Sequence, residues 1–249
     1  MRYNRRPNDR LREIKMICGF QRHPDGSCLI EWGHTKVLCA ATFEDRVPFF
    51  LKNTGEGWVT AEYSLLPSST NTRTQREAKR GRQSGRTEEI QRLIGRALRS
   101  VIDTKALGER TLTVDCDVFE ADGGTRVASI TGAFVAVVLA CEKIYEKGKV
   151  FPVRDFLAAV SVGISQKNEP ILDLSYDEDS TAMVDMNIVM TGEGKFVEIQ
   201  GTGEGRPFTR KEHDSLLELA EKGINEIIDL QKFALGNELS FRVGRVGYN

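Results

Sequence analysis

Residues 111–141 read TLTVDCDVFEADGGTRVASITGAFVAVVLAC and contain an alternating segment, a glycine turn and an apolar segment, in that order. Apolar and polar side chains alternate strictly over Thr111–Val118, which predicts a half-buried β-strand. Residues 128–141 are apolar on every side of a helix, so we expect a buried helix there. The two glycines between these segments predict a tight turn that leads from the strand into the helix.

The segment on the N-terminal side, residues 11–66, is rich in strand signals. Short apolar runs alternate there with turn residues, which predicts a meander of strands. The runs at 27–32 and 35–42 flank a Gly-His pair, and this spacing is typical of a β-hairpin. A further strand is expected from Trp58 to Tyr63.

A helix is predicted to begin near Thr87, between these strands and the quoted stretch. Thr87 is interpreted as its N-cap, and the two glutamates that follow complement the helix dipole. Apolar residues then recur at spacings of three and four, at Ile90, Leu93, Ile94, Ala97, Leu98, Val101 and Ile102. Three arginines fall on the other side and are interpreted as a solvated face: Arg92, Arg96 and Arg99.

The C-terminal half repeats the theme of strands and helices. Strands are expected near 156–164, 171–175, 182–190 and 196–200. A long closing helix follows, and Thr209 and Glu212 form a capping box at its start. The order of elements predicts an α/β (α+β) fold in which two similar βαβα-like halves, with mixed sheets, surround central helices and a common core.

The composition is that of an ordinary globular protein, with 249 residues that form one or two domains. No run approaches the roughly twenty apolar residues of a membrane span, and residues 1–14 lack the apolar region of a secretory signal. We therefore expect a cytoplasmic protein that does not contact a membrane. The 5 cysteines are widely spaced in apolar runs, which predicts small core residues rather than disulfides or a zinc cluster.

Charge is distributed unevenly along the chain. The formal net charge of -1 argues against wholesale electrostatic binding to nucleic acid. Residues 72–100 are nonetheless strongly basic, and their positive side chains are Arg73, Arg76, Lys79, Arg80, Arg82, Arg86, Arg92, Arg96 and Arg99. Such a stretch fits a partner that carries phosphates.

The glycine turn and its surroundings could bind an anion. Adjacent glycines, ending at Gly124, allow a ligand to approach the backbone closely, and the following helix offers unpaired N–H groups. Thr125 and Arg126 add a hydroxyl and a guanidinium. Arg86 is a second candidate, because it lies beside the start of a helix. The residues alone leave open a plain glycine turn with an incidental arginine, and a surface role for Arg86.

Two aspartates could bind a metal ion. Asp185 interrupts an apolar run, where a carboxylate is costly without a partner or a metal, and Asp179 precedes it in an acidic turn. Together they could hold Mg²⁺, which binds through one or two carboxylates plus substrate phosphates. Ordinary turn and hydrogen-bonding roles remain open and are favoured when no further context is considered.

Several familiar mechanisms lack support. The 3 histidines lie near no serine or cysteine nucleophile pattern, so a hydrolase triad is not indicated. The chain has no Walker A sequence, and the glycines of GTGEGRP lack the βαβ continuation of a dinucleotide site.

Several long segments of the chain together resemble one family. They are GWVTAEYSLLP, SGRTEEIQRLIGRALRSVID, DCDVFEADGGTRVASITGAF, EDSTAMVDMNIVMTG and VEIQGTGEGRPF. In these segments the chain resembles the ribonuclease PH family, phosphorolytic exoribonucleases that act on tRNA 3′ ends, from about Arg10 to Gly236. The resemblance implies the fold of polynucleotide phosphorylase and exosome ring subunits, which is ribosomal protein S5 domain 2-like, and a homo-hexamer built as a trimer of dimers.

The resemblance also implies a domain plan and an activity. Residues 1–238 would form a single catalytic domain, and for the tail at 239–249 disorder and added RNA affinity both remain open. The enzyme would trim tRNA precursors and other RNAs, rRNA included, with inorganic phosphate as co-substrate and Mg²⁺ or another divalent ion as cofactor. It would release nucleoside 5′-diphosphates in a readily reversible reaction, and would therefore also act as a tRNA nucleotidyltransferase.

The resemblance assigns roles to particular residues. The attacking phosphate would be bound by Arg86, Gly124, Thr125 and Arg126. The metal and the leaving oxygen would be served by Asp179 and Asp185, so that the catalytic residues are Arg126, Asp179 and Asp185. The RNA would be guided by Arg73, Arg76 and Arg80. Ser68 stands where the family commonly has arginine, which weakens the expectation of one RNA contact.

Two other functions are weighed against this one. A catalytically silent RNA-binding subunit of an exosome-like ring would be expected to lose the phosphate arginines or the acidic pair, and this chain keeps both. A hydrolytic two-metal nuclease normally needs a denser carboxylate cluster. Strict dependence of activity on phosphate would separate phosphorolysis from hydrolysis.

Overall fold

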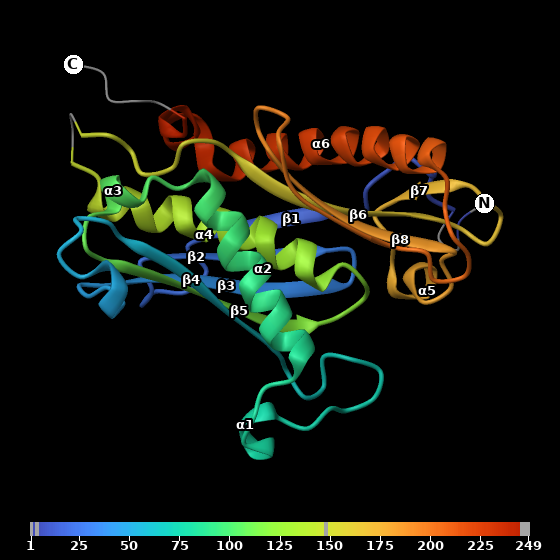
Figure 1. Ribbon diagram of the computed structural model, residues 1–249, viewed down its shortest axis with the longest axis horizontal. Coiled ribbons are helices and arrows are strands. Elements are labelled where there is room, and N and C mark those ends of the chain that lie inside the picture. The colour runs from blue at the N-terminus through green and yellow to red at the C-terminus, as the bar shows by residue number, and fades with distance from the viewer. Residues whose placement is uncertain (1, 3–4, 147–148, 245–249) are drawn as a thin grey trace.

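The strands form two sheets in the computed structural model, which describes residues 2, 5–146 and 149–244 (Figure 1). The first sheet has the order β1-β2-β3-β5-β4 and the second the order β7-β6-β8-β9. The first contains β1 (Ile14–Cys18), β2 (Gly26–Trp32), β3 (Thr35–Glu44), β4 (Trp58–Leu65) and β5 (Thr111–Glu120). The second contains β6 (Leu157–Ile164), β7 (Pro170–Leu172), β8 (Val184–Thr191) and β9 (Phe196–Thr202). The predicted α/β class is confirmed.

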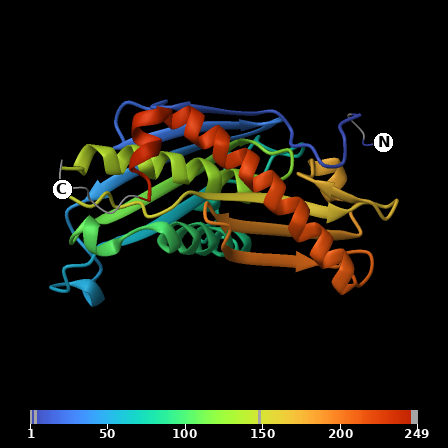
Figure 2. The ribbon, with the colours of Figure 1, turned by 90° about the horizontal axis from the view of Figure 1, so that it is seen from above.

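Helices pack on these sheets and connect them. They are the 3₁₀-helix η1 (Phe49–Leu51), α1 (Glu77–Arg80), α2 (Gly85–Val101), α3 (Thr104–Leu107), α4 (Thr125–Ile144), α5 (Tyr176–Asp179) and α6 (Arg210–Arg242). Figure 2 shows α6 running diagonally over the second sheet, and it contacts β6, β7 and β1. One cluster of buried apolar residues extends through both sheets and the three long helices.

The predicted meander is correct for β1, β2 and β3 but wrong for β4. The hairpin turns at Gly33 and His34, because Trp32 pairs with Thr35. β5 lies between β3 and β4 and is parallel to β4, with Tyr63 opposite Cys116. Parallel neighbours need a long crossover connection, and α2 provides it. The apolar stripe predicted for this helix is buried against the sheet.

The start of α2 lies earlier than predicted. Ser84 is the N-cap, and its Oγ accepts a hydrogen bond of 3.2 Å from the Thr87 N–H. The Thr87 hydroxyl instead donates to Glu77 Oε1 at 2.8 Å. Gly85 and Arg86 therefore belong to the helix, and Arg86 lies in its first turn rather than before it.

The predicted solvated face of α2 is right for two of its three arginines. The side chains of Arg92 and Arg96 are 69% and 57% exposed. Arg99 is half-buried, with its guanidinium 4.5 Å from the centre of the Trp58 ring and a hydrogen bond of 2.6 Å to the Val59 carbonyl. An aromatic neighbour on β4 therefore draws Arg99 out of the solvent.

The helix α4 is the centre of the fold. It packs on β2 and β3 of the first sheet and on β6 of the second. Among the described residues it is the one helix long and apolar enough to cross a membrane, but 78% of its most apolar window is buried. The helix is therefore a core helix of this fold, as the sequence predicts for residues 128–141.

The other sequence-based predictions for the second half hold with small changes. The acidic turn is the single-turn helix α5, and the capping box at Thr209 and Glu212 is confirmed. The helix α6 is interrupted at Gly236, where φ is 77°, and then continues. The tail predicted at 239–249 is thus helical as far as Arg242, which forms an ion pair with Glu142. Residues 245–249 lie outside the described residues.

The cysteines are core residues, as predicted. All five are free thiols, and four of them are buried. Four lie opposite one another on adjacent strands of the first sheet: Cys18, Cys28, Cys39 and Cys116.

Candidate active site

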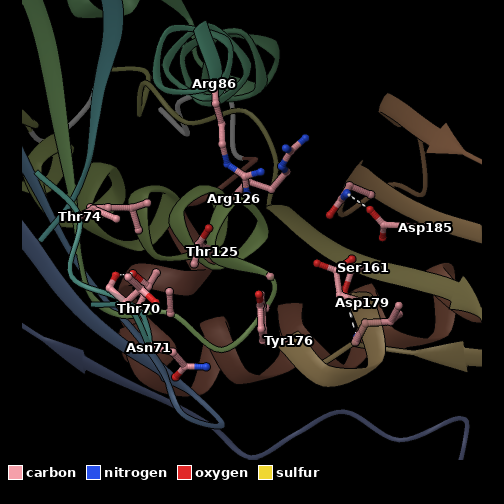
Figure 3. A pocket seen from close by; sticks show the side chains of 17 residues that line it. Thr70, Asn71, Thr74, Arg86, Thr125, Arg126, Ser161, Tyr176, Asp179 and Asp185 are labelled. Atoms are coloured by element: carbon pink, nitrogen blue, oxygen red, sulfur yellow. Dashed lines mark hydrogen bonds between the residues drawn. The ribbon is translucent and has the colours of Figure 1, made fainter. Parts of the chain in front are cut away.

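A cavity of about 520 Å³ opens where the starts of α2 and α4 face the second sheet (Figure 3). The side chains that line it include Thr70, Asn71, Thr74, Arg86, Thr125, Arg126, Ser161, Tyr176, Asp179 and Asp185. Figure 3 shows Arg86 and Arg126 extending toward each other from α2 and α4, with Asp179 and Asp185 across the cavity from them. The cavity therefore has a basic and an acidic wall.

The basic wall begins at the glycine turn. Gly123 and Gly124 have φ of 74° and 69°, a region that favours glycine. A Cβ at Gly123 would lie 2.7 Å from the Leu174 carbonyl oxygen, so the turn also needs the missing side chain. No side chain of the described residues caps α4, and its first-turn N–H groups are therefore free to bind an anion at the cavity.

A buried ion pair holds this turn in place. Arg12 donates from Nη1 to the Asp122 carbonyl and from Nη2, at 3.4 Å, to the Gly123 carbonyl. The same guanidinium also pairs with Asp173, which is completely buried. The distance from Arg12 Nη2 to Asp173 Oδ1 is 2.8 Å. Burial alone would raise the pKa of Asp173, but the charge and hydrogen bonds of Arg12 hold that pKa below its ordinary value. Thr35 adds a hydrogen bond of 2.7 Å from its hydroxyl to the Gly123 carbonyl.

The hydroxyl of Thr125 is oriented by a buried tyrosine. The Tyr63 hydroxyl, on β4, donates to Thr125 Oγ1 at 2.9 Å. Burial raises the pKa of Tyr63 above its ordinary value, so the phenol stays protonated and keeps this donor role. Because Thr125 accepts from Tyr63, its own hydroxyl proton can be donated to a ligand in the cavity.

The two arginines differ in how they are held. Arg126 Nη1 donates to Gln200 Oε1 and lies 3.6 Å from Glu89 Oε1, and its side chain is 16% exposed. Arg86 is exposed and makes no hydrogen bond or ion pair with any described residue. Two guanidiniums that line one cavity form a site suited to phosphate.

The acidic wall consists of Asp179, at the end of α5, and Asp185, on β8. Burial raises the pKa of Asp179, and Arg86 and Arg126 oppose that rise. Burial and the charge of Asp179 raise the pKa of Asp185 to about 6. Asn187 donates to Asp185 Oδ2 at 3.5 Å. A cation near both carboxylates would relieve their repulsion.

The oxygen ligands fit Mg²⁺ better than a soft metal. Within residues 2, 5–146 and 149–244, no three His, Cys, Asp or Glu side chains lie close enough to hold a metal by themselves. Mg²⁺ commonly takes one or two protein carboxylates and completes its shell with water and substrate phosphates. Asp179 and Asp185 match that requirement.

The predicted RNA-binding arginines do not line the cavity. Arg73, Arg76 and Arg80 are exposed on and beside α1, which projects from the body of the molecule (Figure 1). They line a neighbouring hollow of about 530 Å³. Thr74 lines both spaces, so the basic surface adjoins the cavity.

Among the residues of the site that sequence reasoning missed are Tyr63, Glu89 and Gln200. Tyr63 lies in the alternating part of β4, where its hydroxyl in an apolar position was a usable signal. Glu89 was interpreted only as a partner of the helix dipole. Gln200 is one polar residue in a polar edge strand, and no local pattern distinguishes it.

Comparison with known proteins identifies relatives over almost the whole chain. The 3′ exoribonuclease family matches at residues 10–141 with its domain 1 and at residues 155–223 with its domain 2. Ribonuclease PH of Syntrophomonas wolfei is 64% identical over 233 residues, which are 93% of this chain and 97% of that protein. Ribonuclease PH of Bacillus subtilis is 58% identical over 241 residues, which are 96% of this chain and 98% of that protein.

Solved structures share the fold at low identity. Rice Rrp46 has a TM-score of 0.77 at 17% identity, covering 94% of this chain and 100% of that chain. The Archaeoglobus fulgidus exosome with RNA bound to the active site has a TM-score of 0.77 at 21% identity, covering 92% of this chain and 91% of that chain.

Proposed function

Because the chain belongs to the 3′ exoribonuclease family, we propose that the cavity between α2, α4 and β8 is the phosphorolytic centre of the enzyme. The chain is a phosphate-dependent 3′→5′ exoribonuclease that processes tRNA 3′ ends, and its ribonuclease PH relatives are 57% to 64% identical. The reverse reaction adds nucleotides to 3′ ends.

One observation carries the assignment. The cations and free N–H groups of α2 and α4 face the carboxylates of α5 and β8 across a single cavity. Phosphorolysis brings two anions together, inorganic phosphate and the RNA phosphodiester, and the basic wall offsets their repulsion. A hydrolase has no need of a second anion site.

The attacking phosphate is bound by Arg86 and Arg126, the Thr125 hydroxyl and the N–H groups that follow Gly124. Held there, one phosphate oxygen attacks the phosphorus of the terminal phosphodiester in line with the departing oxygen. A new P–O bond forms, the bond to the 3′ oxygen of the preceding nucleotide breaks, and a nucleoside 5′-diphosphate leaves. Asp179 assists the transfer of a proton to the departing oxygen through a water molecule.

Asp179 and Asp185 would hold Mg²⁺ or another divalent ion, which would offset negative charge on the transferred phosphoryl group. The exposed arginines beside α1, Arg73, Arg76 and Arg80, guide the RNA backbone toward the cavity. Contacts of this kind position the strand without reading its sequence. Salt should therefore weaken RNA binding strongly.

The working form is a homo-hexamer, a trimer of dimers. Phe49 and Phe233 support an assembly, because they are 91% and 88% exposed and a monomer would leave them in water.

Residues 1–238 act as a single catalytic domain, which the shared apolar cluster of both sheets supports. The free buried thiols fit a reducing compartment, and we place the enzyme in the cytoplasm.

The test is product analysis with a 3′-tailed tRNA and Mg²⁺, with and without inorganic phosphate. Nucleoside diphosphates that form only with phosphate, and that are lost in Arg126→Ala and Arg86→Ala, would support the assignment. Arg92→Ala is the matched control, because Arg92 is an exposed arginine of the same helix. Nucleoside monophosphates would indicate hydrolysis, and bound but intact RNA would indicate a silent subunit.

The metal site has its own test. Asp185→Asn should raise the Mg²⁺ concentration needed for half-maximal activity while leaving the KM for phosphate nearly unchanged. An unchanged Mg²⁺ requirement would remove Asp185 from the metal site.

A further inference from the structure

Gln200 connects the basic wall of the cavity to the second half of the chain. Its Oε1 accepts a hydrogen bond from Arg126 Nη1, and its Nε2 donates a hydrogen bond of 3.5 Å to Glu89 Oε1. Arg126 belongs to α4, Glu89 to α2 and Gln200 to β9. The orientation of one guanidinium thus depends on three elements that are distant in sequence.

These contacts use only one edge of the guanidinium. Both acceptors, Gln200 and Glu89, meet Arg126 at Nη1. No described residue accepts a hydrogen bond from its Nη2 or Nε. An arginine has five N–H donors in a fixed plane, so fixing one edge sets the direction of the other. Arg126 lines the cavity, so the edge formed by its Nη2 and Nε is available to an anion there.

The chemistry of the acceptor matters as well. Two residues earlier on β9, Glu198 forms a full ion pair with Arg96 of α2. At Arg126, by contrast, the acceptor on β9 is a neutral amide, and the ion pair with Glu89 of α2 is longer, at 3.6 Å, with the Glu89 side chain 38% exposed. A neutral acceptor orients the guanidinium without cancelling the charge that attracts phosphate. The strand therefore carries a carboxylate where no ligand is expected and an amide beside the cavity.

We propose that Gln200 is a positioning residue for phosphate: it orients Arg126 so that the free edge of the guanidinium meets the attacking ion. This inference rests on the proposed role of Arg126 in phosphate binding. It adds a residue of the second half of the chain to the basic wall, whose phosphate-binding residues all come from the first half.

The test is Gln200→Leu, which keeps the approximate size of the side chain and removes the acceptor. The KM for phosphate should rise roughly tenfold, as for a lost hydrogen bond to a charged group, with the KM for tRNA nearly unchanged. Phosphate binding without RNA, measured by calorimetry with inorganic phosphate alone, should weaken by the same factor. Gln200→Met serves as a second apolar replacement if the leucine variant does not fold.

Two controls separate positioning from general loosening and from failure of the proposed function. Glu198→Leu removes the ion pair between Glu198 of β9 and Arg96 of α2 and should leave both KM values unchanged. In Arg126→Ala, adding Gln200→Leu should cause no further loss of phosphate binding. If Arg126→Ala weakens phosphate binding and Gln200→Leu alone does not, the inference on Gln200 is wrong and the proposed site stands. If Arg126→Ala itself has no effect on phosphate, the proposed site fails.

Discussion

Replacing Asp173 with asparagine should destabilise the fold strongly, because a buried cationic cluster would lose its central anion. The carboxylate is completely buried and accepts hydrogen bonds from Arg12, from Arg6 at 2.9 Å and from the Trp32 indole at 2.9 Å. Asparagine keeps the shape but leaves the arginines with less negative charge than before. Breaking a buried pair from one side costs about 3–5 kcal/mol.

For a chain of 249 residues, a loss of this size corresponds to a fall in Tm of about 6–20 °C. Calorimetry and urea unfolding at one fixed protein concentration would measure it, since an oligomer's stability depends on concentration. Asp229→Asn is the matched control, because Asp229 is 76% exposed beside Lys232 and should change stability by no more than about 0.5 kcal/mol. A loss below about 1 kcal/mol for Asp173→Asn would contradict the reasoning.

The same carboxylate predicts a dependence on pH. Its pKa is lower in the folded protein than the value of about 3.9 expected in the unfolded chain. The stability it contributes is therefore fully present above about pH 5, and it is lost as the pH falls through the folded-state pKa. The difference in stability between the original protein and Asp173→Asn should shrink as the pH is lowered from 7 toward 3. A difference that stays constant over that range would rule out this carboxylate as the source.

Three further changes test two supports of the site and one position of the apolar core. Tyr63→Phe removes the hydrogen bond to Thr125 and should raise the KM for phosphate roughly fivefold, the equivalent of about 1 kcal/mol, with an unchanged KM for tRNA. Gly123→Ala places a Cβ against the Leu174 carbonyl at positive φ; it should cost about 1–3 kcal/mol in urea unfolding and reduce phosphate binding. Leu98→Ala, at a fully buried position far from the chemistry, should cost about 2–5 kcal/mol by the same measurement, with KM values unaltered in the folded enzyme.

Sequence patterns predicted the elements whose signals are local. The alternation of β5, the apolar α4 and the capping box at Thr209 all depend on neighbouring residues, and each was predicted correctly. The start of α2 was misplaced by three residues, since Ser84 and Thr87 are both good caps and the choice depends on Glu77. The place of β4 was also missed, because strand order depends on a crossover rather than on the strand itself.

The site was predicted only in part, because local motifs identify its ligands but not the distant residues that support them. The structure brings Arg86, Thr125 and Arg126 to one cavity with Asp179 and Asp185, although sequence spacing could not place the two arginines side by side. What the sequence could not supply were the supports. Asp173 and Gln200 contact the basic wall from a turn and a strand of the second half. Contacts between residues so far apart in the sequence leave no periodic pattern in the chain.

The burial of α4 also makes the two sides of the cavity unequal in local stability. The first turn of α4 carries Thr125 and Arg126, and because the rest of this helix is buried in the core, the turn can move only when the core itself opens. Residues 70–74, on the other side, have little buried apolar surface and can open without disturbing either sheet. At the proposed site, phosphate would meet a surface as stable as the whole fold, while the RNA strand would pass a segment that can adjust to each nucleotide as the RNA shortens.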